Sequence, residues 1–164
     1  MTSFYHPIAG APNFTLAELC KSETAYSKGI YNMPDSTGIA NLTYLAQKVL
    51  QPIRDHFAEP IIISSGYRSP ALNKCIGGSP TSFHAHGCAA DWDFANHSRH
   101  TLLDAFEYIY SNLPFTELIL EEFPGGWIHV AIARGRENEK QLKYKPRGGV
   151  VKRASYGEIL KAVS

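Results

Sequence analysis

The sequence predicts an α+β fold in which helices pack on one side of an antiparallel sheet. Segments with helical and with strand periodicity follow one another in mixed order. Two apolar segments, residues 118–122 and 127–133, flank Pro124-Gly125-Gly126, which predicts that they pair locally as a hairpin. The 164 residues, 44% of them hydrophobic, are enough for one core and too few for two domains. One domain is expected over residues 1–164.

Two helices are expected before the first central strand. Thr15 followed by Glu18 is a capping-box start for a short first helix. Apolar side chains then recur at three- and four-residue intervals from Ile39 to Ile53, which predicts an amphipathic helix that packs on the sheet. Because Pro52 lacks a backbone N–H, it is expected to kink or shorten this helix.

A strand and a helix meet at the next corner. Residues 61–64 are Ile-Ile-Ile-Ser, a sequence typical of a strand. Ser69 and Pro70 fit the N-cap and the first position of a helix, which Gly77-Gly78 ends. Arg68 therefore lies at a strand-to-helix corner, where functional side chains are common.

Residues 89–94 are the next expected strand, because small and aromatic residues alternate there with acidic ones. A period of two places Asp91 and Asp93 on one face and directs Trp92 and Phe94 to the core. Either carboxylate could therefore point toward a metal.

Two further helices are expected after this strand. Apolar periodicity from Leu102 to Leu113 predicts a helix that begins at Ser98 or Thr101 and ends before Pro114. Residues 156–163 suggest a closing helix.

Three residues could converge on one cation. His84 lies in a loop rich in Ser, Thr and Gly, Gly87 permits a sharp turn before the strand of Asp91, and His129 lies in a later strand. Zinc in hydrolytic enzymes keeps three His, Asp or Glu ligands and a water, whose pKa falls to about 7. Spacing alone leaves an alternative open, in which the histidines are hydrogen-bonded core residues and the aspartate a turn residue.

A longer pattern connects these residues. Ser-x-His-x-x-Gly-x-Ala-x-Asp is met by Ser82, His84, Gly87, Ala89 and Asp91, and Trp-x-His by Trp127 and His129. Other matching segments are residues 14–19, 22–25, 32–34, 41–42, 50–54, 65–70 and 72–73. In these motifs the chain resembles the D-Ala-D-Ala carboxypeptidase family of zinc metallopeptidases, most closely its small bacterial and phage-encoded, endolysin-like branch. The resemblance implies a hedgehog/D-Ala-D-Ala peptidase-like fold, a zinc peptidase catalytic domain and action on bacterial cell-wall peptides.

The resemblance also implies residue roles. His84, Asp91 and His129 would bind zinc, and Arg68 would contact substrate. An ion pair with an acidic neighbour is the alternative for Arg68. His86 occupies a position where the family requires no histidine, so it either supports the ligands or is merely exposed.

The general base is the point where the sequence departs from the wider family. Many members carry an acidic residue three positions before the second zinc histidine, but here Gly126 stands there. Glu121 and Glu122 are the candidates. A four-residue hairpin loop would put Glu122 on the face of His129, whereas one residue more or fewer favours Glu121. Glu121 is preferred, and Glu122 stays as the alternative.

The implied mechanism is metal-assisted amide hydrolysis. The glutamate would take a proton from water and pass it to the leaving amine, while Arg68 would stabilise negative charge or hold a substrate carbonyl or carboxylate. The expected enzyme is a D-Ala-D-Ala carboxypeptidase or a murein endopeptidase. The alternative is a non-catalytic, zinc-stabilised cell-wall-binding module.

Composition restricts the partners. A formal net charge of +1 argues against a nucleic-acid binder, and no run approaches the ~18 apolar residues of a membrane span. A monomer whose partner is a peptidoglycan peptide is expected. The basic residues near the carboxyl terminus are expected to form a solvated tail segment, with attraction to an anionic wall polymer as the alternative. They are Lys140, Lys143, Lys145, Arg147, Lys152 and Arg153.

Cysteine usage and the amino terminus bear on the compartment. Three cysteines without a Cys-x-x-Cys pair predict buried free thiols rather than a disulfide framework. Residues 1–7 have neither the basic nor the apolar region of a secretion signal. We expect synthesis in the cytoplasm and release to the cell wall as a phage lysis or virion protein, with a cytoplasmic peptidase as the alternative.

Overall fold

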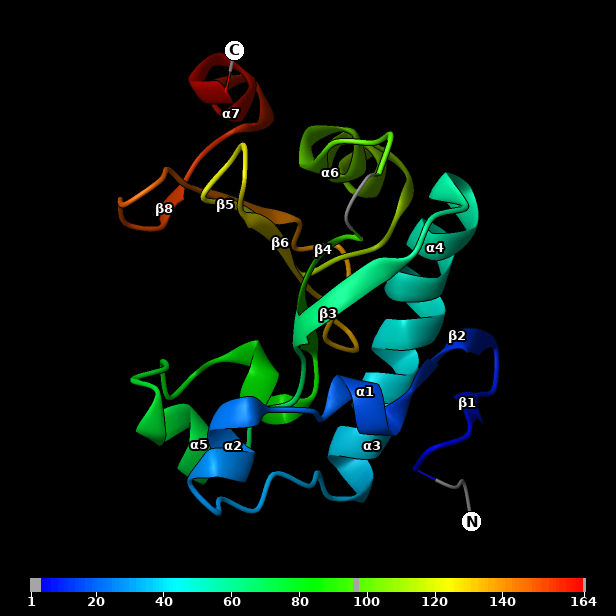
Figure 1. Ribbon diagram of the computed structural model, residues 1–164. Coiled ribbons are helices and arrows are strands. Elements are labelled where there is room, and N and C mark those ends of the chain that lie inside the picture. Colours follow the sequence, from blue (N-terminus) through cyan, green and yellow to red (C-terminus); the bar gives the residue numbers. More distant parts are fainter. Residues whose placement is uncertain (1–3, 96–97, 164) are drawn as a thin grey trace.

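A six-stranded sheet forms the centre of the computed structural model, which describes residues 4–95 and 98–163 (Figure 1). The strand order is β3–β4–β6–β5–β7–β8. The strands are β3 (Ile61–Ser65), β4 (Ala89–Phe94), β5 (Glu117–Glu121), β6 (Trp127–Ala131), β7 (Gln141–Lys145) and β8 (Lys152–Arg153). All neighbours are antiparallel except β5 and β7, which are parallel. The α+β fold class is confirmed, whereas β7 and its parallel pairing are not foreseen by the sequence.

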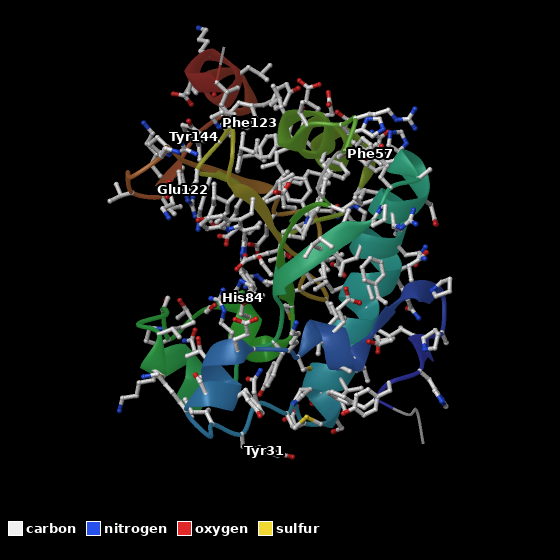
Figure 2. The ribbon with its side chains drawn as sticks, in the orientation of Figure 1. Tyr31, Phe57, His84, Glu122, Phe123 and Tyr144 are labelled. Carbon is white, nitrogen blue, oxygen red and sulfur yellow. The ribbon has the colours of Figure 1, made fainter. Side chains whose placement is uncertain are left out.

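One face of this sheet is the hydrophobic core. Its buried side chains are Ala90, Trp92, Phe94, Leu118, Leu120, Ile128 and Val130. Helices α3 (Ser36–Leu45), α4 (Gln51–Phe57) and α6 (Leu102–Asn112) pack their buried residues into the same cluster. In Figure 1, α4 and α6 lie on the same side of the strands, and Figure 2 labels Phe57 of α4 on this side. The opposite face is therefore left for polar residues.

The predicted helix from Ile39 to Ile53 is longer and less regular than expected. Helix α3 continues through a π-helical segment, η1 (Ala46–Leu50), directly into α4, where Pro52 occupies the first turn. The expectation that Pro52 shortens the helix is wrong. The wider π turns accommodate the proline ring and its missing N–H, so the helix continues to Phe57.

The shorter elements are β1 (Pro7–Ile8), β2 (Ala11–Thr15), α1 (Leu16–Leu19), α2 (Glu23–Ser27), α5 (Pro70–Cys75), η2 (Phe83–His86) and α7 (Tyr156–Val163). Helices α1 and α5 begin at the predicted caps. The hydroxyls of Thr15 and Ser69 accept backbone N–H groups of α1 and α5 at 3.1 and 3.3 Å. Thr101, rather than Ser98, caps α6 and forms a capping box with Asp104. These local signals determine where each helix starts.

The basic carboxyl-terminal segment is not a solvated tail. Lys143 and Lys145 belong to β7, the strand that pairs with β5, and both form ion pairs with glutamates.

Cys20 and Cys88 are buried free thiols as predicted, but the free thiol of Cys75 is exposed. Within residues 4–95 and 98–163, no helix combines the length and the apolar character needed to cross a membrane. In the sequence, residues 1–7 show no secretion-signal features. Of these, residues 1–3 lie outside the described residues.

Candidate metal centre

His84 lies in the 3₁₀ turn η2, which is fixed at both ends. The Ser82 hydroxyl accepts the backbone N–H of His84 at 3.3 Å, and Gly87 ends the turn with a φ of 69°. In the ring, Nδ1 lies 2.7 Å from the carbonyl oxygen of Gly66. Because a carbonyl can only accept, Nδ1 carries the proton, and the lone pair of the neutral ring is on Nε2.

Asp91 and His129 meet this nitrogen from two adjacent strands. They are register partners in the β4–β6 ladder, so both side chains project from the polar face of the sheet. His129 Nδ1 lies 2.8 Å from Asp91 Oδ1, and His84 Nε2 lies 3.2 Å from each of these two atoms. His84, Asp91 and His129 are only 3%, 8% and 7% exposed. The structure thus brings together the three ligands that the sequence proposes.

The spacing of these atoms suits a small metal ion. Tetrahedral zinc with bonds of about 2.0–2.2 Å has ligand atoms about 3.3–3.6 Å apart. The observed separations of 2.8–3.2 Å are close to this, so a small outward shift would admit the ion. Among the described residues, His84, Asp91 and His129 are the group identified as able to hold a metal.

The electrostatics of the cluster favour a cation between the three side chains. Burial disfavours the Asp91 carboxylate, but its contacts with the His84 and His129 rings outweigh burial and lower the pKa of Asp91. Burial lowers the pKa of His84, which favours the neutral ring that a metal requires. Burial also opposes a charge on His129, yet its carboxylate neighbours raise its pKa to about 9. A metal ion would replace this proton as the positive charge.

Arg68 joins the cluster from the corner between β3 and α5. Its Nη2 donates to Asp91 Oδ2 at 2.7 Å, and its Nε donates to the Ser65 hydroxyl at 2.8 Å. Asp91 therefore offers Oδ1 to the histidines while Oδ2 is held by a cation. The acidic neighbour considered for Arg68 is thus one of the candidate ligands. The Arg68 side chain is still 19% exposed, so it also remains accessible from solvent.

The Arg68 corner is fixed by Asn32, to which the sequence alone assigns no role. Asn32 is buried, and its Oδ1 accepts the N–H of Ser69 at 2.7 Å. Its Nδ2 donates to the carbonyls of Tyr67 and Cys20 at 3.1 and 2.9 Å. Both neighbours of Arg68 are therefore tied to the segment that follows α2, and through Asn32 to Cys20 at the end of α1.

Glu121 shares the face of His129. It is the register partner of Trp127, so residues 122–126 form a five-residue hairpin loop rather than a four-residue one. In that register Glu121, Ile119 and His129 project to the same side of the sheet. Burial and the nearby charge of Asp91 raise the pKa of Glu121. These are the surroundings expected of a group that exchanges protons.

Glu122 points elsewhere. Its backbone has a φ of 56°, its carboxylate accepts the N–H of Gly148 at 3.0 Å, and it lies 2.9 Å from Lys145 Nζ. In Figure 2 it lies at the end of the hairpin, well away from His84. Gly126 could not carry the family's acidic side chain, because a Cβ there would lie 1.7 Å from the carbonyl oxygen of Glu121.

Glu117 is a site residue that the sequence reasoning misses. It is 8% exposed, and its Oε1 lies 3.2 Å from His129 Nε2, the ring nitrogen that faces away from Asp91. Lys143 donates to its other oxygen. Burial opposes ionisation, but the contacts with His129 and Lys143 lower the pKa of Glu117 to about 2. Its position two residues before Ile119 is the only sequence signal, and it is usable only once the register is known.

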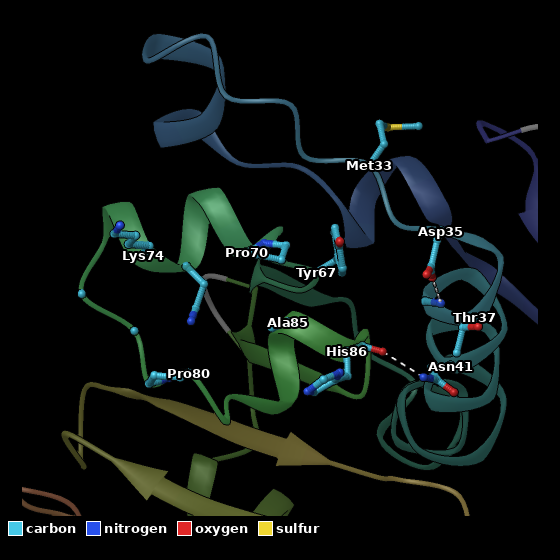
Figure 3. Close-up of a pocket in the computed structure, with 14 residues that line it drawn as sticks. Met33, Asp35, Thr37, Asn41, Tyr67, Pro70, Lys74, Pro80, Ala85 and His86 are labelled. Atoms are coloured by element: carbon cyan, nitrogen blue, oxygen red, sulfur yellow. Dashed lines mark hydrogen bonds between the residues drawn. The ribbon is translucent and has the colours of Figure 1, made fainter.

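His86 and Asp93 lie outside the cluster. His86 is exposed, and its carbonyl accepts from Asn41 at 2.9 Å at the wall of a 910 Å³ cavity (Figure 3). None of the three candidate ligands lines this cavity. Asp93 is exposed beside Ile62 of β3. Neither residue is placed to support the ligands.

Two smaller polar cavities adjoin the cluster. One of 350 Å³ includes Arg68 and Lys21 in its lining. The other, of 380 Å³, is lined by Glu117 and His129 together with Lys143 and other residues. A substrate could therefore approach the centre from two sides.

Sequence comparison identifies the family. Residues 12–131 match the sequence model of the peptidase M15 family. The chain belongs to the M15 peptidase family. The resemblance deduced from the motifs is thereby confirmed. All three candidate ligands, Arg68, Glu117 and Glu121 fall within the M15 match, whereas β7 with Lys143 and Lys145 follows it.

A curated relative of this M15 chain is the zinc D-Ala-D-Ala carboxypeptidase of Streptomyces albus G. The two are 32% identical over 124 residues, which cover 75% of this chain and 46% of the relative. The chain thus spans about half the length of the relative that it matches.

Proposed function

We propose that this M15 family member is a zinc-dependent peptidase that hydrolyses an amide bond in the stem peptides of bacterial peptidoglycan. Its activity would be that of a D-Ala-D-Ala carboxypeptidase or a murein endopeptidase. The observation that carries the proposal is the buried cluster of two imidazoles and one carboxylate, with ligand atoms 2.8–3.2 Å apart. The named activity of the Streptomyces relative supports the choice of metal and of substrate class.

The three side chains fit zinc by number, type and direction. His84 would bind through Nε2, Asp91 through Oδ1 and His129 through Nδ1, because these atoms face one another. Three protein ligands leave one position open, as in catalytic rather than structural zinc sites. Zinc held there supplies Lewis acidity toward a carbonyl and lowers the pKa of a water to about 7.

Glu121 is the proposed general base. It lies on the face of His129, and its raised pKa suits a group that takes a proton from water and returns it to the leaving amine. Arg68 is proposed to hold a substrate carbonyl or carboxylate. One of its terminal nitrogens binds Asp91, and its side chain borders a polar cavity.

The cavities beside the cluster support a peptide substrate with carboxylates. The 350 Å³ cavity contains Arg68 and Lys21, and the 380 Å³ cavity contains Arg136 and Lys143. Stem peptides present free carboxylates, which cationic side chains recognise.

Mass spectrometry of purified peptidoglycan after digestion tests the proposal. We expect zinc-loaded protein to release D-alanine, or to convert cross-linked to uncross-linked muropeptides, and these products distinguish the two activities. A chelator should abolish both. If protein with one bound zinc neither releases D-alanine nor cleaves cross-linked muropeptides, the proposal fails. A non-catalytic, wall-binding module then becomes the better interpretation.

A further inference from the structure

His129 uses its two ring nitrogens in opposite directions. Nδ1 faces Asp91 Oδ1 and His84 Nε2 at 2.8 and 3.2 Å. Nε2 is buried, and the Oε1 atom of Glu117 lies 3.2 Å from it. This contact falls short of good hydrogen-bond geometry, and no other group in the described part of the chain hydrogen-bonds to Nε2.

The nature of that neighbour matters for metal binding. A histidine binds a metal through a nitrogen that carries a lone pair, and its second nitrogen then carries the proton. A carboxylate beside the second nitrogen can only accept, so it stabilises the ring form with the proton on Nε2 and the lone pair on Nδ1. Such carboxylate–histidine pairs orient metal-bound rings and increase their basicity.

Glu117 is itself held in place. Lys143 donates to Oε2, which leaves Oε1 directed at His129. Lys143 comes from β7, where it is the register partner of Ile119, so it projects from the polar face together with Glu117 and His129. The parallel pairing of β5 and β7 thus completes a chain of contacts from Lys143 through Glu117 to His129.

We propose that Glu117 is a positioning residue for the metal centre, which holds the His129 ring with Nδ1 toward the ion, and that Lys143 locks Glu117 in this role. This inference rests on the proposed function, because it requires that zinc binds at the cluster. A purely structural ion pair between Glu117 and Lys143 would stabilise the fold without affecting metal affinity. Zinc affinity therefore separates the two roles.

The test compares four variants on the same strand pair. Glu117→Gln keeps the shape of the side chain but removes its charge, and Lys143→Met removes the lock. Glu121→Gln and Lys145→Met are matched controls four residues and two residues further along β5 and β7. The zinc dissociation constant is measured by competition with a chromophoric chelator, and the visible spectrum of the Co²⁺-loaded protein reports the ligand geometry.

We expect Glu117→Gln to weaken zinc binding about 10–100-fold and to alter the Co²⁺ spectrum. Lys143→Met should weaken zinc binding less, and both controls should stay within about twofold of the parent protein. Parental affinity in Glu117→Gln overturns the inference, as does an equal loss in both controls. If Glu117→Gln does not fold, Lys143→Met decides on the same scale, and unchanged affinity there is the negative result. A parent protein that binds no zinc would instead refute the proposed function, and with it this inference.

Discussion

The two ends of β5 carry the same pair of residue types in different surroundings. At the first end Glu117 pairs with Lys143 of β7, and at the second end Glu121 lies 3.7 Å from Lys145. Both glutamates project from the polar face, on either side of Ile119, the register partner of His129. Strand position alone therefore does not distinguish them.

Their partners do. Glu117 accepts a hydrogen bond from Lys143 and lies 3.2 Å from His129 Nε2, and despite burial its pKa falls to about 2. Glu121 makes a longer, 3.7 Å contact with Lys145, which also pairs with Glu122, and burial raises the pKa of Glu121. A carboxylate that never protonates suits an anchor, and one whose pKa lies closer to neutrality suits a proton carrier. The contacts at each end of one strand therefore give the same residue type different roles.

The largest effect is expected from removing the proton carrier. Glu121→Gln should lower kcat/KM for a stem-peptide substrate about 10²–10⁴-fold, because the amide keeps the shape but cannot accept the proton. Glu122→Gln, at the hairpin end and paired with Gly148 and Lys145, should stay within several-fold of the parent. Steady-state kinetics on zinc-loaded protein measures both. The reverse ranking would mean that the loop adopts the other parity in solution.

The sequence predicts the positions of Asp91 and Arg68 in this site. The alternation in residues 89–94 correctly places Asp91 and Trp92 on opposite faces of the sheet. The Ser69-Pro70 signal correctly places Arg68 at the corner between a strand and a helix. Both are local properties of one segment, governed by strand period and by helix capping. The ligand set itself comes from the family resemblance.

The positions of Glu117, Glu121 and Lys143 could not be predicted from local pattern. The choice between Glu121 and Glu122 depends on whether the hairpin loop has four or five residues, and both lengths suit the same sequence. Glu117 precedes the predicted strand, and Lys143 lies in a segment expected to be a solvated tail. Their proximity arises from the parallel pairing of β7 with β5, a contact between strands that no short-range signal specifies.

A smaller effect is expected at Arg68, which holds Asp91 Oδ2 as Lys143 holds Glu117. If Arg68 serves substrate, Arg68→Ala should lose about 10²-fold in kcat/KM, as for a removed charge-stabilising donor. Its zinc affinity should change less than in Glu117→Gln, and its melting temperature with zinc should match the parent. Kinetics, chelator competition and thermal melting provide the three readings. Unfolding, or full activity, would show that Arg68 is structural or dispensable.

Proton release on zinc binding offers a further test of the Glu117 end. Asp91 and Glu117 together outweigh burial and raise the pKa of His129 to about 9, so below this pH the metal-free ring carries an extra proton. Zinc must displace it, and its apparent affinity should rise about tenfold per pH unit from neutrality toward pH 9, then level off. Calorimetry at pH 7.5 in buffers of different ionisation enthalpy should therefore show about one proton released. Glu117→Gln should reduce this number and Glu121→Gln should not.

The smallest expected effect distinguishes the two lysines. The charge of Lys145 lowers the pKa of Glu121 against the larger effect of burial. Partly exposed pairs of this kind contribute about 0.2–1 kcal/mol, and about 1.4 kcal/mol corresponds to one pH unit. Lys145→Met should therefore move the acidic limb of the kcat/KM profile upward by a few tenths of a pH unit, because the base then deprotonates at higher pH. Lys143→Met should leave this limb in place and weaken zinc binding instead. If both substitutions moved the limb equally, the two ends of β5 would not act independently, and the division of roles between Glu117 and Glu121 would have to be abandoned.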